Sequence, residues 1–115
     1  MILRTFVFRV KRTKQRTVVG FMRREALRLL RRIPACRAAF FCRNPSTSPL
    51  ASARGKLRAG PKRKGEYMWV TVWRNQRAVR AAQKRKDWQR IMRIEEGEYF
   101  AGRPKAQHFE VLLTK

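Results

Sequence analysis

The segment Glu66–Trp73 constrains the fold more than any other stretch, because it is rich in aromatic and β-branched residues and follows a glycine. Residues of these types favour β-strands, so the segment predicts a strand that begins after Gly65. Successive side chains of a strand point to opposite faces of a sheet. One face is therefore predicted to carry Tyr67, Trp69, Thr71 and Trp73, and the other to carry Met68, Val70 and Val72.

The two faces of this strand predict different surroundings. The purely apolar face, with one methionine and two valines, is expected to pack on helices. The aromatic face also carries a phenol, a hydroxyl and two indole N–H groups, which suits a cavity for a flat organic molecule. Aromatic strands more often serve packing, so these residues could instead fill a core or a dimer interface. The candidate ligand-binding residues are Tyr67, Trp69, Thr71 and Trp73.

The rest of the chain predicts three more strands and two helical regions. Alternating apolar residues predict strands over Ile2–Val10, Cys36–Arg43 and Gln107–Leu113. Apolar residues at steps of three and four predict a helix over Gln15–Ile33, which Pro34 ends.

The second helical region is predicted in two pieces. Asn75 is expected to cap a helix over Gln76–Lys84, and Asp87 to cap a shorter piece that contains Trp88. The order β-α-β-β-α-β with right-handed crossovers predicts an α+β, ferredoxin-like fold, with a four-stranded antiparallel sheet and both helical regions on one face. Its strands are apolar on both sides, so the uncovered face is expected to meet the same face of a second copy.

The composition allows one folded domain with an extreme positive charge. The chain has 115 residues, of which 43% are hydrophobic, so a single domain over residues 1–115 is expected. It holds 30 Lys and Arg against 7 Asp and Glu, a net charge of +23. Residues 1–65 hold 19 of the basic residues and a single acid, Glu25. A charge of this size attracts polyanions.

The basic residues gather in two places. On the first predicted helix, Arg24, Arg28 and Arg32 recur at steps of four, where like charges repel. Residues 44–64 are rich in turn-forming and basic residues and are expected to form a disordered loop. The candidate polyanion-binding residues are Arg24, Arg28, Arg32, Arg58, Lys62, Arg63 and Lys64. An alternative function is therefore a cationic scaffold, natural or supercharged, that binds nucleic acid or another polyanion without catalysis.

Several other functions find no support in the sequence. Cys36 and Cys42 on one strand lie about 20 Å apart, too far for a disulfide. With His108 as the one histidine, no metal-ligand spacing exists, and a reducing, cytoplasmic location is expected. No apolar run approaches the roughly 20 residues of a membrane span.

The order and spacing of several short motifs resemble the antibiotic biosynthesis monooxygenase-type domain family. The motifs cover the chain outside residues 44–64 and are Pro34-Ala35-Cys36, Val70-Thr71-Val72-Trp73, Ala78-Val79, Asp87-Trp88-Gln89 and His108-Phe109-Glu110-Val111. The resemblance implies a homodimeric α/β barrel of two ferredoxin-like units, with a pocket between each sheet and its helices. Some members of the family oxidise aromatic polyketides with O2 and no cofactor, and others degrade haem.

The resemblance also implies which residues would act. At the positions of the haem-degrading branch this chain has Ala82 and Met92, and its first strand has no Asn, so haem degradation is disfavoured. At the positions of the cofactor-free oxygenases, Trp73 and Arg93 match, whereas Trp69 and Val79 replace an Asn and a Tyr. The implied activity is thus a cofactor-independent oxygenase that binds an apolar aromatic ligand. Its candidate catalytic residues are Trp73, Arg93 and His108.

Overall fold

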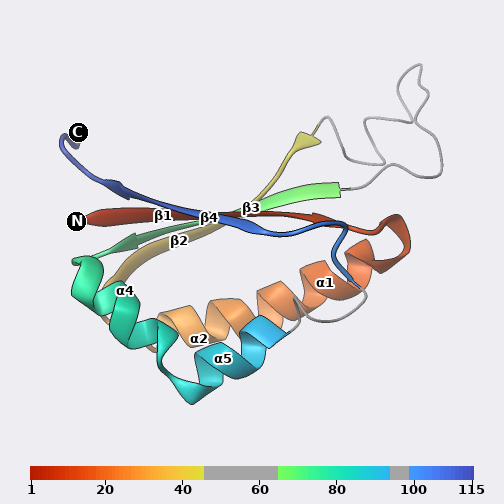
Figure 1. The fold of residues 1–115 in the computed structure, drawn as a ribbon, viewed down its shortest axis with the longest axis horizontal. Coiled ribbons are helices and arrows are strands. Elements are labelled where there is room, and N and C mark those ends of the chain that lie inside the picture. Colours follow the sequence, from red (N-terminus) through yellow and green to blue (C-terminus); the bar gives the residue numbers. More distant parts are fainter. Residues whose placement is uncertain (46–64, 94–98) are drawn as a thin grey trace.

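A four-stranded antiparallel sheet carries the helices that the structure describes on one of its faces, as Figure 1 shows for the computed structural model. The structure describes residues 1–45, 65–93 and 99–115. The sheet order β2-β3-β1-β4 is the ferredoxin-like arrangement that the sequence predicts. The strands are β1 (Ile2–Val10), β2 (Cys36–Arg43), β3 (Gly65–Trp73) and β4 (Lys105–Glu110).

The first helical region runs without a break over the predicted span. It ends at Arg31, shortly before Pro34, and its predicted apolar stripe is buried. One turn has π-helical geometry, which the sequence pattern does not reveal. Its consecutive parts are η1 (Arg12–Lys14), α1 (Gln15–Phe21), η2 (Met22–Ala26) and α2 (Leu27–Arg31). The buried stripe consists of Val18, Met22, Ala26, Leu29, Leu30 and Ile33.

The second helical region forms α4 (Gln76–Gln83) and α5 (Lys86–Met92). The Asn75 side chain accepts a hydrogen bond of 2.8 Å from the Ala78 backbone N–H and caps α4 as predicted. The predicted cap of α5 is wrong by two residues, because Arg85 holds the N-cap position and Asp87 lies within the first turn. Among the helices that the structure describes, none combines the length and the apolar character that crossing a bilayer requires.

The central strand β3 faces the helices with the opposite side from the one predicted. Tyr67, Trp69, Thr71 and Trp73 are buried beneath the helices, whereas the valine face is only partly buried. Both faces are apolar, so hydrophobicity alone cannot choose between them. The bulky rings fill the thick layer between sheet and helices, and helix side chains supply their polar partners. The Tyr67 hydroxyl donates to Gln15 Oε1 at 2.9 Å, and the Trp69 indole N–H contacts Met22 Sδ at 3.3 Å.

Stacked aromatic rings join three strands at the end of the sheet near α1. The Phe8 ring on β1 lies 5.9 Å from that of Tyr67, 6.2 Å from that of Phe41 and 4.9 Å from that of Phe100. Phe41 also packs on Trp69, at 4.9 Å between ring centroids. This cluster anchors β2 and β3 to β1 beneath the helices, and each pair adds about 0.5–1.5 kcal/mol beyond its burial.

The other side of the sheet, here called the open face, is not covered by any helix that the structure describes (Figure 1). Phe40 remains 58% exposed and Phe109 49% exposed, which is unusual for side chains of this size. By strand register the open face holds Leu3, Thr5, Val7, Ala38, Phe40, Cys42, Met68, Val70, Val72, Lys105, Gln107 and Phe109.

The last strand is displaced from its predicted span. It covers Lys105–Glu110 rather than 107–113, because Glu110 already lies opposite Ile2, the first residue of β1. One further backbone bond, from Val111 N–H to the Met1 carbonyl, brings the two termini together. Beyond that point β1 offers no more backbone for pairing. The predicted loop over residues 44–64 falls, from residue 46 onward, outside the described residues.

Candidate functional site

A small apolar cavity lies between the sheet and the helices, where η2, α2 and α5 meet over β1 and β3. Its volume of about 40 Å³ exceeds the roughly 10–15 Å³ that one water molecule needs. It is far below the roughly 300–1,000 Å³ of a typical ligand site. The lining residues are Arg4, Phe6, Met22, Ala26, Leu29, Leu30, Trp69, Thr71, Trp88, Ile91 and Met92.

Among the described residues that line this cavity, Arg4 is the one with a charged side chain. It points from β1 toward the helices and is 7% exposed. Its guanidinium carbon lies 5.4 Å from the centre of the Phe6 ring and 5.6 Å from that of Trp88, within the range of cation–π attraction. The sequence analysis did not single out Arg4. The available signal was a lone charged residue on the Ile2, Phe6, Phe8 and Val10 face of the first strand.

Thr71 and His108 flank Arg4 on the two neighbouring strands. Arg4 pairs with Thr71 on β3 and with His108 on β4, so all three lie in one row across the sheet. The imidazole Nδ1 of His108 is 3.1 Å from the Gln76 side-chain nitrogen on α4. Partial burial, and then the nearby charge of Arg4, lower the pKa of His108 below its usual 6.5. The ring is therefore neutral at pH 7 and able to accept a proton.

Trp73 does not line the cavity, but it contacts Thr71 and Trp88, which do. It is fully buried, and its indole N–H donates a 2.8 Å hydrogen bond to Thr71 Oγ1. Its ring meets that of Trp88 edge-on, at 6.1 Å. Of the four predicted ligand-binding residues, Trp69 and Thr71 line the cavity, whereas Trp73 and Tyr67 do not. Burial raises the pKa of Tyr67, and the nearby Arg43 opposes this shift.

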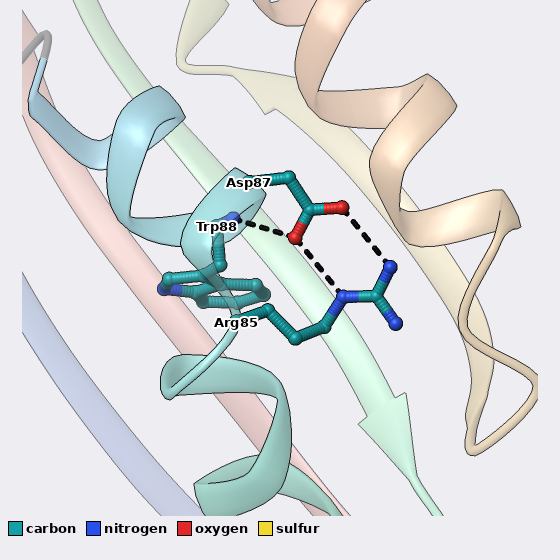
Figure 2. A network of polar contacts seen from close by, with 3 residues as sticks. All are labelled: Arg85, Asp87 and Trp88. Atoms are coloured by element: carbon teal, nitrogen blue, oxygen red, sulfur yellow. Dashed lines mark hydrogen bonds and ion pairs between the residues drawn. The ribbon is translucent and has the colours of Figure 1, made fainter.

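A salt bridge at the start of α5 fixes the turn that carries Trp88. Figure 2 shows the Arg85 guanidinium against the Asp87 carboxylate, with two N–O distances of 3.0 Å. Asp87 Oδ1 also accepts a 2.9 Å hydrogen bond from the Trp88 backbone N–H. These bonds favour the carboxylate form, and the pKa of Asp87 is lowered, chiefly by Arg85. The Trp88 side chain extends away from the ion pair and into the cavity wall.

His108, which is exposed on β4, and the other predicted functional residues do not line the cavity. Arg93 is exposed just after α5, and the structure does not bring it together with His108 or Trp73. Arg24, Arg28 and Arg32 are exposed on the first helical region. The remaining predicted polyanion contacts lie outside the described residues, and these are Arg58, Lys62, Arg63 and Lys64.

Cys36 and Cys42 both lie on β2 as free, partly buried thiols. Burial raises the pKa of the Cys36 thiol, which donates to the Ala38 carbonyl at 3.5 Å. Within residues 1–45, 65–93 and 99–115, no three His, Cys, Asp or Glu side chains gather in a way that could hold a metal ion.

Solved structures with this fold include several antibiotic biosynthesis monooxygenases. A proposed member from Deinococcus radiodurans superposes with a TM-score of 0.75 at 9% identity, covering 100% of this chain and 96% of that one. One from Nitrosomonas europaea gives 0.70 at 12% identity, with 98% and 100% covered. A variant of SnoaB, a cofactor-independent oxygenase from Streptomyces nogalater, gives 0.63 at 16% identity, with 98% and 94% covered. No sequence profile of a known family and no curated protein sequence matches the chain. At these identities the similarity establishes the fold.

The row formed by Arg4 and His108 leads to a prediction about protonation. Replacing Arg4 by Gln removes a positive charge beside the imidazole, so the pKa of His108 should rise. With one histidine in the chain, its NMR signals can be followed through a pH titration without ambiguity. The matched control is Arg9→Gln, an exposed arginine on the same strand, which should leave that pKa unchanged. An unchanged titration in Arg4→Gln would show that the two groups do not interact.

Proposed function

We propose that this chain, which has the fold of the antibiotic biosynthesis monooxygenases, is a homodimeric protein that binds a flat apolar molecule in the cavity between its sheet and its helices. The observation that carries the proposal is the buried Arg4 in an otherwise apolar cavity wall. The ligand we propose has an aromatic or conjugated ring system and an oxygen that bears, or can acquire, negative charge.

The physical argument begins with the cost of burying a guanidinium. Moving a charged group out of water is expensive, and the cation–π contacts with Phe6 and Trp88 are among the interactions that offset this cost. In so apolar a surrounding, an oxyanion interacts with Arg4 much more strongly than it would in water. Arg4 therefore selects for a ligand oxygen with negative charge, while Trp69, Trp88 and Ile91 provide apolar contact for the rings.

Ligand binding requires the cavity of about 40 Å³ to enlarge. The cavity lining includes side chains that can change conformation. Met22 and Met92 are unbranched and adapt readily to a new shape. The π-helical turn Met22–Ala26 lies directly against the cavity, and such turns are frequent at functional sites. We therefore propose that the two methionines and the π-helical turn change conformation when the ligand binds.

Oxygenation without a cofactor requires an electron-rich carbon. Loss of a proton from a carbon beside a conjugated ketone leaves a carbanion whose charge is shared with the ketone oxygen, and this anion can react with O2. In our proposal Arg4 stabilises the charge on that oxygen, which is the kind of electrostatic help that contributes most to catalysis. His108, neutral at pH 7, is the proposed proton acceptor.

The structure suggests different parts for the two other residues that the family resemblance offered. Trp73 holds the Thr71 hydroxyl through a hydrogen bond of 2.8 Å, so we assign it a positioning role. Arg93 is exposed after α5, and for it to act on a ligand in the cavity its side chain would have to fold back over α5.

We place the dimer contact on the open face. Phe40 and Phe109 are about half exposed there, with Phe40 beside Val70 of β3 and Phe109 beside Leu3 of β1. A second copy that presents the same surface would remove these side chains from water, which is the main favourable term in association. The contact would join two sheets and leave both helix layers outside.

The ligand proposal is tested by isothermal titration calorimetry with 2-naphthoate and its neutral isostere 2-naphthamide, in 0.5 M NaCl. Wild-type protein should bind the carboxylate more tightly. Arg4→Met keeps an unbranched side chain that reaches about as far as the arginine Nε and removes the charge, so it should weaken naphthoate binding about 10- to 100-fold, as expected for a charge-assisted hydrogen bond. Arg9→Met should change neither affinity. Equal losses for both probes in Arg4→Met would mean that Arg4 serves packing alone.

The oxygenase proposal is tested separately with anthrone in an oxygen electrode. The expected conversion of its CH2 group by one O2 gives anthraquinone and one water. Wild-type protein should accelerate oxygen uptake, Arg4→Met should lose most of the acceleration, and the rate should fall as pH drops below the lowered pKa of His108. Uptake no faster than in buffer would refute the oxygenase activity and leave the binding result intact.

The dimer is tested by light scattering after size-exclusion chromatography in 0.5 M NaCl. The wild type should elute at twice the 13.7 kDa of one chain. Val70→Asp buries a charge in the proposed contact and should give monomers, whereas Thr17→Asp makes the same charge change on exposed helix surface and should remain dimeric. A monomeric wild type, or a Val70→Asp variant that still dimerises, would contradict this contact.

A further inference from the structure

Exposed cations follow the outer surfaces of two adjacent helices. In the first helical region Arg24, Arg28 and Arg32 recur at steps of four, and all three are exposed. On α5, basic side chains recur at steps of four and three and border an open depression. The two helices lie side by side, because residues from both line the cavity beneath them (Figure 1). Together the arginine face consists of Arg24, Arg28, Arg32, Lys86, Arg90 and Arg93.

Among the residues that the structure describes in the two helical regions, acidic side chains are rare. Residues 15–33 contain one acid, Glu25, and residues 76–93 contain one, Asp87. Asp87 is already held by Arg85 at 3.0 Å. Among the described residues, no member of the arginine face takes part in an ion pair. Like charges four residues apart on a helix cost a few tenths of a kcal/mol per pair, so the surface opposes folding unless a polyanion neutralises it.

The chemistry of the surface favours phosphate groups. Five of its six cations are arginines, whose planar guanidinium can donate two parallel hydrogen bonds to one phosphate. Double-stranded nucleic acid presents about one negative charge per 1.7 Å of its axis, so neighbouring cations along a helix can each find a partner.

Two observations limit the kind of polyanion that fits this surface. The first argues against a membrane, and the second argues against stacking on unpaired bases. The large apolar side chains that are exposed in the described residues lie on the open face or at the termini, so the helix layer offers nothing to insert into a membrane. They are Met1, Phe40, Phe109, Leu112 and Leu113. No aromatic side chain on the arginine face is available to stack on bases, so contact would be limited to the backbone.

We infer that the arginine face binds the phosphate backbone of double-stranded nucleic acid without sequence preference. This surface lies on the helices, away from both the cavity interior and the open face. Binding there is compatible with a ligand in the cavity and with a dimer joined through its sheets. The inference therefore stands or falls independently of the proposed oxygenase.

The test is fluorescence anisotropy with a labelled 20-base-pair DNA duplex, from 50 to 300 mM NaCl. The triple variant Arg24→Gln, Arg28→Gln, Arg32→Gln should lose at least tenfold in affinity at 50 mM. Its slope of log affinity against log salt should be shallower by roughly one unit per lost contact. The matched control, Arg74→Gln, Arg103→Gln, Lys115→Gln, removes the same charge from exposed positions outside the helices. It should keep most of the affinity and most of the salt dependence.

Three results would overturn the inference. The first is an equal loss in both triple variants, which would show that net charge alone drives binding. The second is wild-type affinity that does not change with salt. The third is equally tight binding to vesicles that contain phosphatidylserine, with the same dependence on the three helix arginines, which would make the surface a general anion site. Thermal unfolding of each variant confirms that the fold is intact.

Discussion

The packing of the aromatic face of β3 against the helices is the interaction on which the rest of the structure depends. β3 pairs with β1 on one side and β2 on the other, and its four large or polar side chains under the helices are all at most 6% exposed. Their polar atoms are satisfied by Gln15 and Thr71, while Met22 contacts the Trp69 indole N–H. Because this layer absorbs the bulky rings, the smaller Met68, Val70 and Val72 are left on the flat open face. Such a face suits contact with another sheet better than contact with a helix.

The same layer contains the cavity and its charge. A guanidinium in an apolar wall is a costly arrangement, and costly polar groups in otherwise apolar layers often mark functional sites. Arg4 lies at the point where the rings of Phe6 and Trp88 can face it, with Thr71 and His108 beside it in the sheet. The salt bridge between Arg85 and Asp87 fixes the turn that presents Trp88 to this site (Figure 2). The position of α5 therefore affects both the packing of this layer and the geometry around Arg4.

The residues that stabilise the fold of this molecule are largely different from those that carry its positive charge. The fold needs the apolar stripe of the first helical region, which lies inside, and places few demands on the residues outside. Those outer positions carry arginines although mixed charges would stabilise the helix better. The helix layer and the open face point in opposite directions (Figure 1), so one molecule can present a polyanion surface and a dimer contact at once.

The order of the strands and helices, the ferredoxin-like arrangement and the Asn75 cap could be predicted from the amino-acid sequence. These follow from local periodicity and from cap chemistry. Only the tertiary structure decided which face of β3 meets the helices, since both faces are apolar and the choice depends on the volume of the layer and on partners such as Gln15. Tertiary structure likewise ended β4 at Glu110, where β1 runs out. It also turned Arg4, an ordinary arginine in the sequence, into the charged wall of a cavity, because residues 4 and 88 come together only when the sheet and α5 pack.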